Sequence, residues 1–108
     1  MRGAKNMREK PRLEWRPHAL ADLLNIVAHI ADDNPDAAQE LKDEIEAKAA
    51  KLPDHRKLYK ASTRVKGMRE MVVTRNYIVL YRETKERIEV VSVLHARRLW
   101  PPTKDIKP

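Results

Sequence analysis

Hydrophobic positions along the chain change their spacing near residue 68, which divides the chain into a helical part and a strand part. From Pro17 to Ala31 the apolar residues recur at intervals of three and four, the period of an amphipathic helix. A second helical pattern covers Pro35–Leu52, with Asn34 as its expected N-cap. The stretch between the two patterns is so short that the helices must form an antiparallel hairpin.

Alternating and β-branched runs predict four strands. The first is Arg12–Arg16, and three more follow the helices at Met68–Thr74, Tyr77–Glu83 and Arg87–His95. The last three are joined by connections of a length that suits hairpins. The order β-α-α-β-β-β predicts an α+β domain, in which the helical hairpin covers one face of a mostly antiparallel four-stranded sheet. The predicted core contains Leu20, Leu24, Val27, Leu41, Ile45, Val72, Leu80 and Val90.

Length and composition fit one domain with an aliphatic core. The chain has 108 residues, no Phe and no Cys, so disulfides are excluded. We expect a loose tail at residues 1–11, in which Met7 offers an alternative start, one domain at residues 12–102, and a second tail at residues 103–108. No segment approaches the ~20 apolar residues of a membrane span, and no secretory signal is apparent. We therefore expect a cytoplasmic protein with no membrane partner.

Charge is distributed unevenly between the two parts of the chain. Residues 54–100 carry 12 Lys and Arg against 5 Asp and Glu, whereas residues 17–52 carry 3 against 8. This separation favours a polyanionic partner for the second part, with nucleic acid first and an acidic protein second. The loop at residues 55–67 is long and basic, and loops of this kind are often functional.

The chain favours metal-free chemistry over a metal or cofactor site. Its histidines lack the spacing of metal ligands, and we interpret His18, His29 and His55 as structural or exposed. Strand alternation groups Tyr77 with Tyr81, and His95 with Val91 and Val93. We predict that the helix-free face of the sheet, ringed by cations and with Tyr for stacking, holds a single RNA strand. The predicted binding residues are Lys60, Arg64, Lys66, Tyr77, Tyr81, Arg82 and Arg98.

Cleavage of RNA without a metal requires attack of a 2′-hydroxyl on the adjacent phosphate, assisted by a base, an acid and cations. His95, at the end of the last predicted strand, is the candidate for proton exchange, and Arg69 and Arg97 are candidates for binding the scissile phosphate. Trp100 and the prolines after it are expected to close the core. The alternative for His95 is a structural role as a hydrogen-bonded residue at the strand end.

Several motifs together resemble the RelE/ParE superfamily of bacterial type II toxins, and its plasmid-stabilisation RelE/StbE branch in particular. They are GMREMVV, NYIVLYRE and RIEVVSVLHARRLWP, behind a helix start W-x-P-x-A-x-x-D-L-x-x-I at Trp15. The resemblance covers residues 12–102. It implies a small α/β toxin that has no cofactor and is neutralised by a cognate antitoxin, which wraps an acidic and apolar segment over it.

The resemblance leaves the molecular target open. RelE-type members are ribosome-dependent mRNA endonucleases, whereas ParE-type members poison DNA gyrase. We favour the mRNA endonuclease because of the W-P ending and the basic loop, and because His95 matches the strand-end His of several nuclease members. Ile78 stands where RelE-like endonucleases commonly carry a catalytic Arg, which favours the gyrase inhibitor. The third interpretation is a non-enzymatic module that binds nucleic acid or protein.

Overall fold

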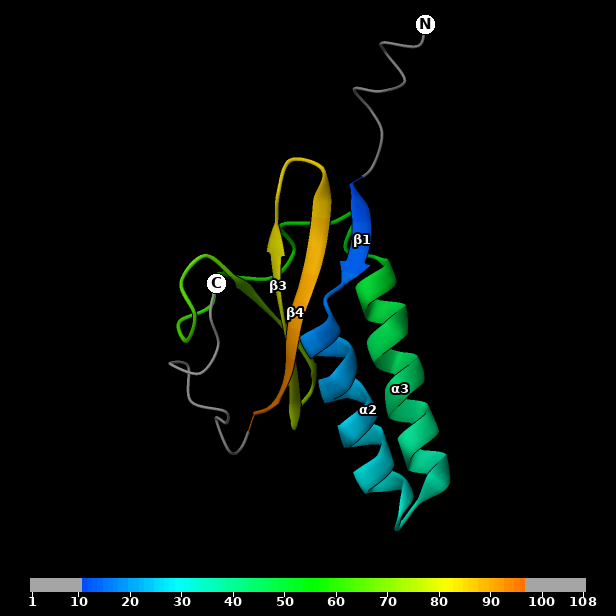
Figure 1. Ribbon diagram of the computed structural model, residues 1–108. Helices are drawn as coiled ribbons and strands as arrows, with labels where there is room; N and C mark the ends of the chain where they lie inside the picture. Colours follow the sequence, from blue (N-terminus) through cyan, green and yellow to red (C-terminus); the bar gives the residue numbers. More distant parts are fainter. Residues whose placement is uncertain (1–10, 97–108) are drawn as a thin grey trace, which may run out of the picture.

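The computed structural model describes residues 11–96, which form a helical hairpin packed on one face of a four-stranded sheet (Figure 1). This confirms the predicted α+β class and the β-α-α-β-β-β order. The second helix is two residues shorter than predicted, and the predicted tails lie outside the described residues except for Pro11. Within residues 11–96, no helix is both long and apolar enough to cross a membrane. The elements are β1 (Arg12–Trp15), α2 (Pro17–Ala31), α3 (Pro35–Ala50), β2 (Arg69–Thr74), β3 (Tyr77–Glu83) and β4 (Arg87–His95).

The helices begin where the sequence predicts. Pro17 and Pro35 occupy the first turns of α2 and α3. A backbone N–H in the first turn has no partner within the helix, so the N–H that proline lacks costs no hydrogen bond there. Asn34 caps α3, since its Oδ1 accepts a hydrogen bond from the Ala37 N–H at 3.0 Å. The predicted N-cap is therefore confirmed.

The strands lie in the order β1-β4-β3-β2. β2, β3 and β4 form an antiparallel meander, and β1 pairs with β4 in parallel. Because β1 has four residues and β4 has nine, β1 covers only the first part of the outer edge of β4. Beyond the end of β1, Asp22 of α2 hydrogen-bonds to β4 in place of a neighbouring strand. Its carboxylate accepts hydrogen bonds from the Val93 N–H at 3.0 Å and from Ser92 Oγ at 2.7 Å. The side chain thus satisfies part of an edge that β1 leaves unpaired.

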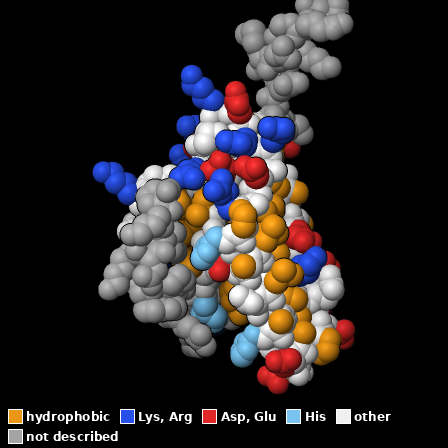
Figure 2. Space-filling model, in the orientation of Figure 1, with side chains coloured by type: hydrophobic (Ala, Val, Ile, Leu, Met, Phe, Trp, Pro, Cys, Tyr) orange, Lys and Arg blue, Asp and Glu red, His pale blue; other side chains and the backbone are white. Residues whose placement is uncertain are grey.

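The main core lies between the helices and the sheet, but the buried side of α2 differs from the prediction. Leu20 and Leu24 are 45% and 60% exposed, so their placement in the core is wrong. Ala19 and Leu23 are buried in their place. The apolar stripe of α2 is wider than the surface that one helix can bury, and its outer margin faces solvent, where Figure 2 shows apolar side chains on the helices. Of the other predicted core residues, Leu41, Ile45 and Val90 are buried in this cluster, and Val27 packs partly buried against it.

A second apolar cluster covers the helix-free face of the sheet. The loop before β2 contributes Val65 and Met68, which pack with three residues of β3 and β4. Gly67 lies between them with φ +84°, a conformation that glycine adopts readily, so the chain can turn there. The prediction that RNA binds an open helix-free face is therefore wrong for the centre of that face, because loop residues cover the sheet there. The cluster consists of Val65, Met68, Leu80, Val91 and Leu94.

Two further differences on the sheet follow from strand position and register. Val72 is 51% exposed, because it belongs to the edge strand β2 and faces opposite to the buried Met71 and Val73. In β4, Val91 is an extra residue, since Tyr81 pairs with Val90 while Leu80 pairs with Ser92. This bulge places Val91 in the second cluster and Val93 in the main core, so the prediction that they share a face is wrong.

Candidate functional site

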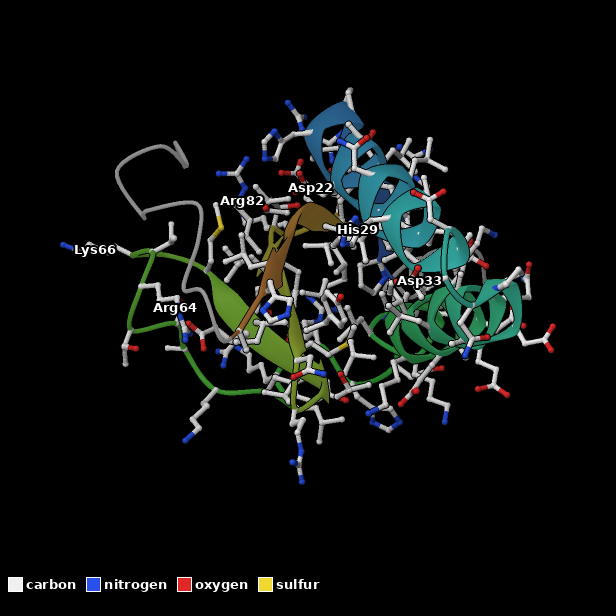
Figure 3. All side chains as sticks on the ribbon, turned by 90° about the horizontal axis from the view of Figure 1, so that it is seen from below. Asp22, His29, Asp33, Arg64, Lys66 and Arg82 are labelled. Atoms are coloured by element: carbon white, nitrogen blue, oxygen red, sulfur yellow. The ribbon has the colours of Figure 1, made fainter. Side chains whose placement is uncertain are left out.

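The predicted arginines of β2, β3 and the loop are held in ion pairs within the fold. Each guanidinium meets a carboxylate whose side chain is mostly buried, so its charge is matched inside the domain. Lys60 and Lys66 remain exposed, and Figure 3 shows Lys66 pointing away from the domain. The pairs are Arg69 with Glu83 at 3.0 Å, Arg64 with Glu70 at 2.7 Å and Arg82 with Glu89 at 2.9 Å.

Arg69 lies far from His95 along the sheet. It pairs with Tyr81 in the register, whereas His95 pairs with Tyr77. Four residues of β3 separate these positions, about 13 Å at the usual rise of a strand. Nη1 of Arg69 also donates a hydrogen bond to the Tyr59 carbonyl at 2.7 Å. The structure therefore does not bring Arg69 and His95 to one phosphate.

The Glu70 carboxylate fastens the loop to the start of the sheet. It accepts hydrogen bonds from Ser62 Oγ and from Arg64 Nη1, both at 2.7 Å. Burial by itself raises the pKa of Glu70, but these hydrogen bonds and the Arg64 charge outweigh it and hold the pKa below its ordinary value. Arg64 thus has a structural partner, and the loop brings Val65 onto the helix-free face.

Glu89 is the most buried of the carboxylates in these ion pairs. Its side chain is 5% exposed and meets Arg82 from β3 and Arg87 from its own strand, the latter at 3.5 Å. Arg87 also approaches Glu14 of β1 at 3.7 Å. These charges join three neighbouring strands, and Figure 2 shows Lys and Arg interleaved with Asp and Glu toward the end of the molecule that holds β1.

Tyr81 belongs to the core under the helices and cannot stack on a base. Its side chain is fully buried, its hydroxyl donates to the Arg56 carbonyl at 2.9 Å, and its ring meets Tyr59 edge-on. Burial raises the pKa of this phenol. The prediction that Tyr81 forms part of an exposed stacking surface is wrong, because the face it shares with Val79 is the face that the helices cover.

His95 and Tyr77 lie together at the opposite end of the sheet. Their rings meet edge to face, with centroids 5.1 Å apart and planes at 76°. His95 is half-buried, and its Nδ1 is shielded from solvent with no hydrogen-bond partner among residues 11–96. The imidazole thus packs against Tyr77, and its Nδ1 has no partner within the described part of the chain.

A hollow of about 230 Å³ opens beside these two rings, between α2 and the ends of β3 and β4. Figure 3 views the molecule from this end and labels His29 on α2. The sequence analysis interpreted His29 as structural or exposed and did not name Asn25, although their spacing of four residues places them on one side of the helix. The hollow is lined by Asn25, Ile26, His29, Tyr77 and His95.

The hollow has the composition of a site for proton exchange. Two imidazoles, an amide and a phenol surround it, and imidazole is the side chain that most readily gains and loses a proton near neutral pH. Among residues 11–96, no group of three His, Cys, Asp or Glu is placed to bind a metal ion. Arg97 and Arg98, the predicted cations nearest in sequence to His95, lie outside the described residues, as does Trp100.

The fold and the sequence together define a class of bacterial toxin. Residues 13–100 match the family described as "ParE toxin of type II toxin-antitoxin system, parDE". Because the match spans most of the chain, the chain belongs to the ParE toxin family, within the RelE/ParE superfamily. The resemblance to the RelE/ParE superfamily is thereby confirmed, while the RelE/StbE branch stays a prediction, and a cognate antitoxin is implied as the partner.

One named relative and two solved structures are similar to this chain. The chain is 34% identical over 96 residues to the protein named "Putative toxin Y4kP" of Sinorhizobium fredii, an alignment that covers 85% of this chain and 95% of the relative. A chain of the chromosomal ParDE TA system from P. aeruginosa is similar with a TM-score of 0.71 and 20% identity, over 80% of this chain and 96% of that one. YafQ from E. coli aligns with a TM-score of 0.48 and 16% identity, over 85% of this chain and all of YafQ. At such identities the P. aeruginosa structure establishes the fold alone.

Proposed function

We propose that this type II toxin inhibits growth as a metal-independent, ribosome-dependent mRNA endonuclease, with His95 as a proton-exchanging residue. The observation that carries the proposal is the hollow at the end of the sheet, which the half-buried His95 imidazole lines together with Tyr77. Tyr77 orients the ring from one side. A positioned imidazole of this kind is the usual general acid or base of a metal-free site.

The proposed step is an internal transfer within the RNA. The ribose 2′-oxygen forms a bond to the adjacent phosphorus, and the bond from phosphorus to the 5′-oxygen of the next nucleotide breaks. A base takes the 2′-hydroxyl proton, and an acid gives a proton to the departing 5′-oxygen. The products are a 2′,3′-cyclic phosphate and a 5′-hydroxyl, and no metal or oxidant is consumed. His95 supplies one of the two proton transfers.

The phosphate needs cations close to His95. Arg97 follows that residue by two positions and remains the proposed phosphate ligand. Lys60, Lys66 and Arg98 are proposed to bind the RNA or the ribosome. Arg69, which the sequence placed at the phosphate, is not part of the proposed site, because its guanidinium is paired with Glu83 at the other end of the sheet.

The antitoxin is proposed to lay an acidic and apolar segment over the basic part of the chain. Exposed lysines of the loop and of the β3–β4 turn, at positions 57, 60, 66 and 85, support this placement. Association should slow as salt is added, since attraction between opposite charges is screened over about 10 Å at 0.1 M salt. A salt series of association rates tests this. A rate that does not respond to salt, with the antitoxin seated only on the helices, would contradict it.

Inhibition of DNA gyrase is the second candidate function. The engaged guanidinium groups of Arg64, Arg69 and Arg82 favour it, because they leave fewer cations free for an RNA phosphate. The family description names the ParE type, whose members poison gyrase. In this case the toxin would act by binding a protein surface, and the hollow would be a docking feature.

One pair of assays separates the candidates. Purified toxin is incubated with ribosomes that carry a defined mRNA, and separately with gyrase and supercoiled DNA. We expect the mRNA to be cut only when the ribosome is present, with no rise in gyrase–DNA cleavage complexes. Accumulation of those complexes with intact mRNA would overturn the endonuclease and establish the gyrase inhibitor. Inactivity in both assays, in a preparation that still binds its antitoxin, would favour the non-enzymatic module.

A further inference from the structure

The hollow at the end of the sheet brings together two imidazoles that are distant in the sequence. His95 comes from the end of β4, and His29 comes from the last turns of α2. His95 is half-buried and held by Tyr77, whereas His29 is exposed. Asn25 lies one turn before His29 on the same helix and lines the same hollow. The α2 helix therefore contributes a proton-exchanging group and an amide to the same space as the proposed catalytic residue.

The chemistry of RNA transfer needs two proton-exchanging groups rather than one. A single imidazole cannot remove the 2′-hydroxyl proton and at the same moment protonate the 5′-oxygen on the other side of the phosphorus. The second group has to line the same hollow and be of a kind that serves as a general acid or base. His29 lines the hollow, and imidazole is the side chain most often used in that role.

Other titratable groups near α2 do not meet them. The Asp22 carboxylate already accepts hydrogen bonds from Ser92 and Val93, and His18 is directed to that carboxylate at 3.4 Å. Neither residue lines the hollow. Tyr77 does line it, but its ring is engaged edge to face with His95.

We propose that His29 is the second catalytic residue of this toxin and forms an acid–base pair with His95, an inference that rests on the proposed endonuclease function. The scissile phosphate would lie between the two imidazoles, with the 2′-hydroxyl toward one and the 5′-oxygen toward the other. The proton taken from the 2′-hydroxyl by one imidazole is matched by the proton that the other imidazole gives to the leaving oxygen. Asn25 then offers hydrogen bonds to a base or ribose that enters the hollow.

The first test compares histidine variants on ribosome-bound mRNA. His29→Ala and His95→Ala should each cut the defined mRNA about 10²–10⁴-fold more slowly than the unchanged toxin. His55→Ala is the matched control, since His55 is an exposed loop histidine away from the hollow, and its rate should stay within about twofold of the unchanged toxin. Antitoxin affinity and the thermal unfolding midpoint, measured on each variant, establish that the variants are folded.

The second test assigns the two roles with a sulfur-substituted substrate. Replacing the leaving 5′-oxygen by sulfur removes the need for an acid, because a thiolate departs without a proton. The variant that lacks the acid should recover to within about tenfold of the unchanged toxin on this mRNA, and the variant that lacks the base should not. Recovery of His29→Ala on this substrate is a result that a merely structural role of His29 would not produce. If His95→Ala recovers instead, the pH profile of cleavage by His29→Ala separates the two roles, since loss of a base removes one limb of the profile and loss of a structural residue keeps both.

The outcomes separate the inference from the function on which it rests. If the unchanged toxin fails to cut mRNA on ribosomes, the proposed endonuclease function falls and the acid–base pair falls with it. If the unchanged toxin cuts mRNA and His29→Ala cuts it equally fast, only the role of His29 is overturned. That role is also overturned if His29→Ala and His95→Ala respond alike to the sulfur substitution.

Discussion

The two ends of the sheet differ in how their polar side chains are paired. At the end near β1, guanidinium groups meet carboxylates, as in the contacts of Arg82 and Arg87 with the buried Glu89. At the other end, no hydrogen bond or ion pair within the described part of the chain ties the imidazoles of His29 and His95. Buried charges are normally matched, because an unmatched one is costly. The matched end near β1 therefore contributes to stability through its ion pairs, although Arg87 Nε and Glu14 Oε1 there also lack a hydrogen bond among the described residues, and the end with the hollow is the one that we propose for a ligand.

The comparison predicts opposite effects from two residues that the sequence assigns to one site. His95→Ala should lower mRNA cleavage about 10²–10⁴-fold and leave the free energy of unfolding nearly unchanged. Arg69→Ala should lower the free energy of unfolding by about 1–3 kcal/mol, since it removes hydrogen bonds to Glu83 and a loop carbonyl, and should leave cleavage within a few-fold. Cleavage rates and denaturant unfolding of both variants test this. Loss of cleavage in a fully stable Arg69→Ala variant would return Arg69 to the catalytic site.

The hollow depends on α2 being held against the sheet, and adjacent leucines on that helix test this dependence. Leu23 is 3% exposed in the core, so Leu23→Ala should cost about 2–5 kcal/mol of unfolding free energy. Leu24 is 60% exposed, so Leu24→Ala should cost less than about 1 kcal/mol. Denaturant titrations of the two variants provide the measurement. Equal losses would show that the outer side of α2 is buried in solution.

The matched end should lose stability when a carboxylate is neutralised. Glu89→Gln leaves Arg82 and Arg87 without that counter-charge, and we expect a loss of about 2–3 kcal/mol. The loss stays moderate because both guanidinium groups reach solvent. Glu86→Gln, at an exposed position of the β3–β4 turn, is the control and should change stability by less than about 0.5 kcal/mol. A neutral effect of Glu89→Gln, measured by thermal and denaturant unfolding, would show that the network does not stabilise the fold.

The smallest effect expected is a pH dependence of stability from Glu70. Its pKa is lowered in the folded state, so its contribution is complete above the unfolded-state value of about 4.3 and is lost as pH falls through the lower folded-state pKa. Glu70→Gln should therefore flatten the acid limb of the stability curve. Arg64→Ala should flatten it in part, because Ser62 still donates to the carboxylate. Unfolding measured from neutral pH to about pH 3 gives both curves.

The elements were predictable from the sequence because helix and strand periods are local. The bounds of α2, β3 and β4 agree with the predicted ranges, and the Asn34 cap is a local contact. The buried side of α2 was missed, because it depends on which part of a wide apolar stripe meets the sheet. The face of the sheet on which Val91 lies was missed as well. A bulge adds one residue to the strand, and the run of apolar residues in β4 does not show where that residue is.

The candidate site was less predictable than the fold. His95 stands at a strand end, which alternation locates, but its neighbour His29 comes from a helix that only the tertiary packing brings to it. Arg69 and Tyr81 carry the right chemistry for RNA, yet one meets Glu83 and the other is covered by the helices. Pairing and burial are set by long-range contacts, so residue type and spacing could not exclude these two.

The bulge in β4 gives that strand an unusual tolerance to a change of length. Losing one residue from a strand ordinarily turns every later side chain to the opposite face. Deletion of Val91 would instead restore a regular ladder, in which Ser92 still pairs with Leu80 and His95 still pairs with Tyr77. The loss of a single codon at this position would therefore keep the imidazole beside α2. The loss of Val93 would instead remove a paired residue and leave the bulge in place, so the register after it would shift by one residue. In evolutionary terms, position 91 is the place in β4 where the chain can shorten while the histidine end keeps its geometry.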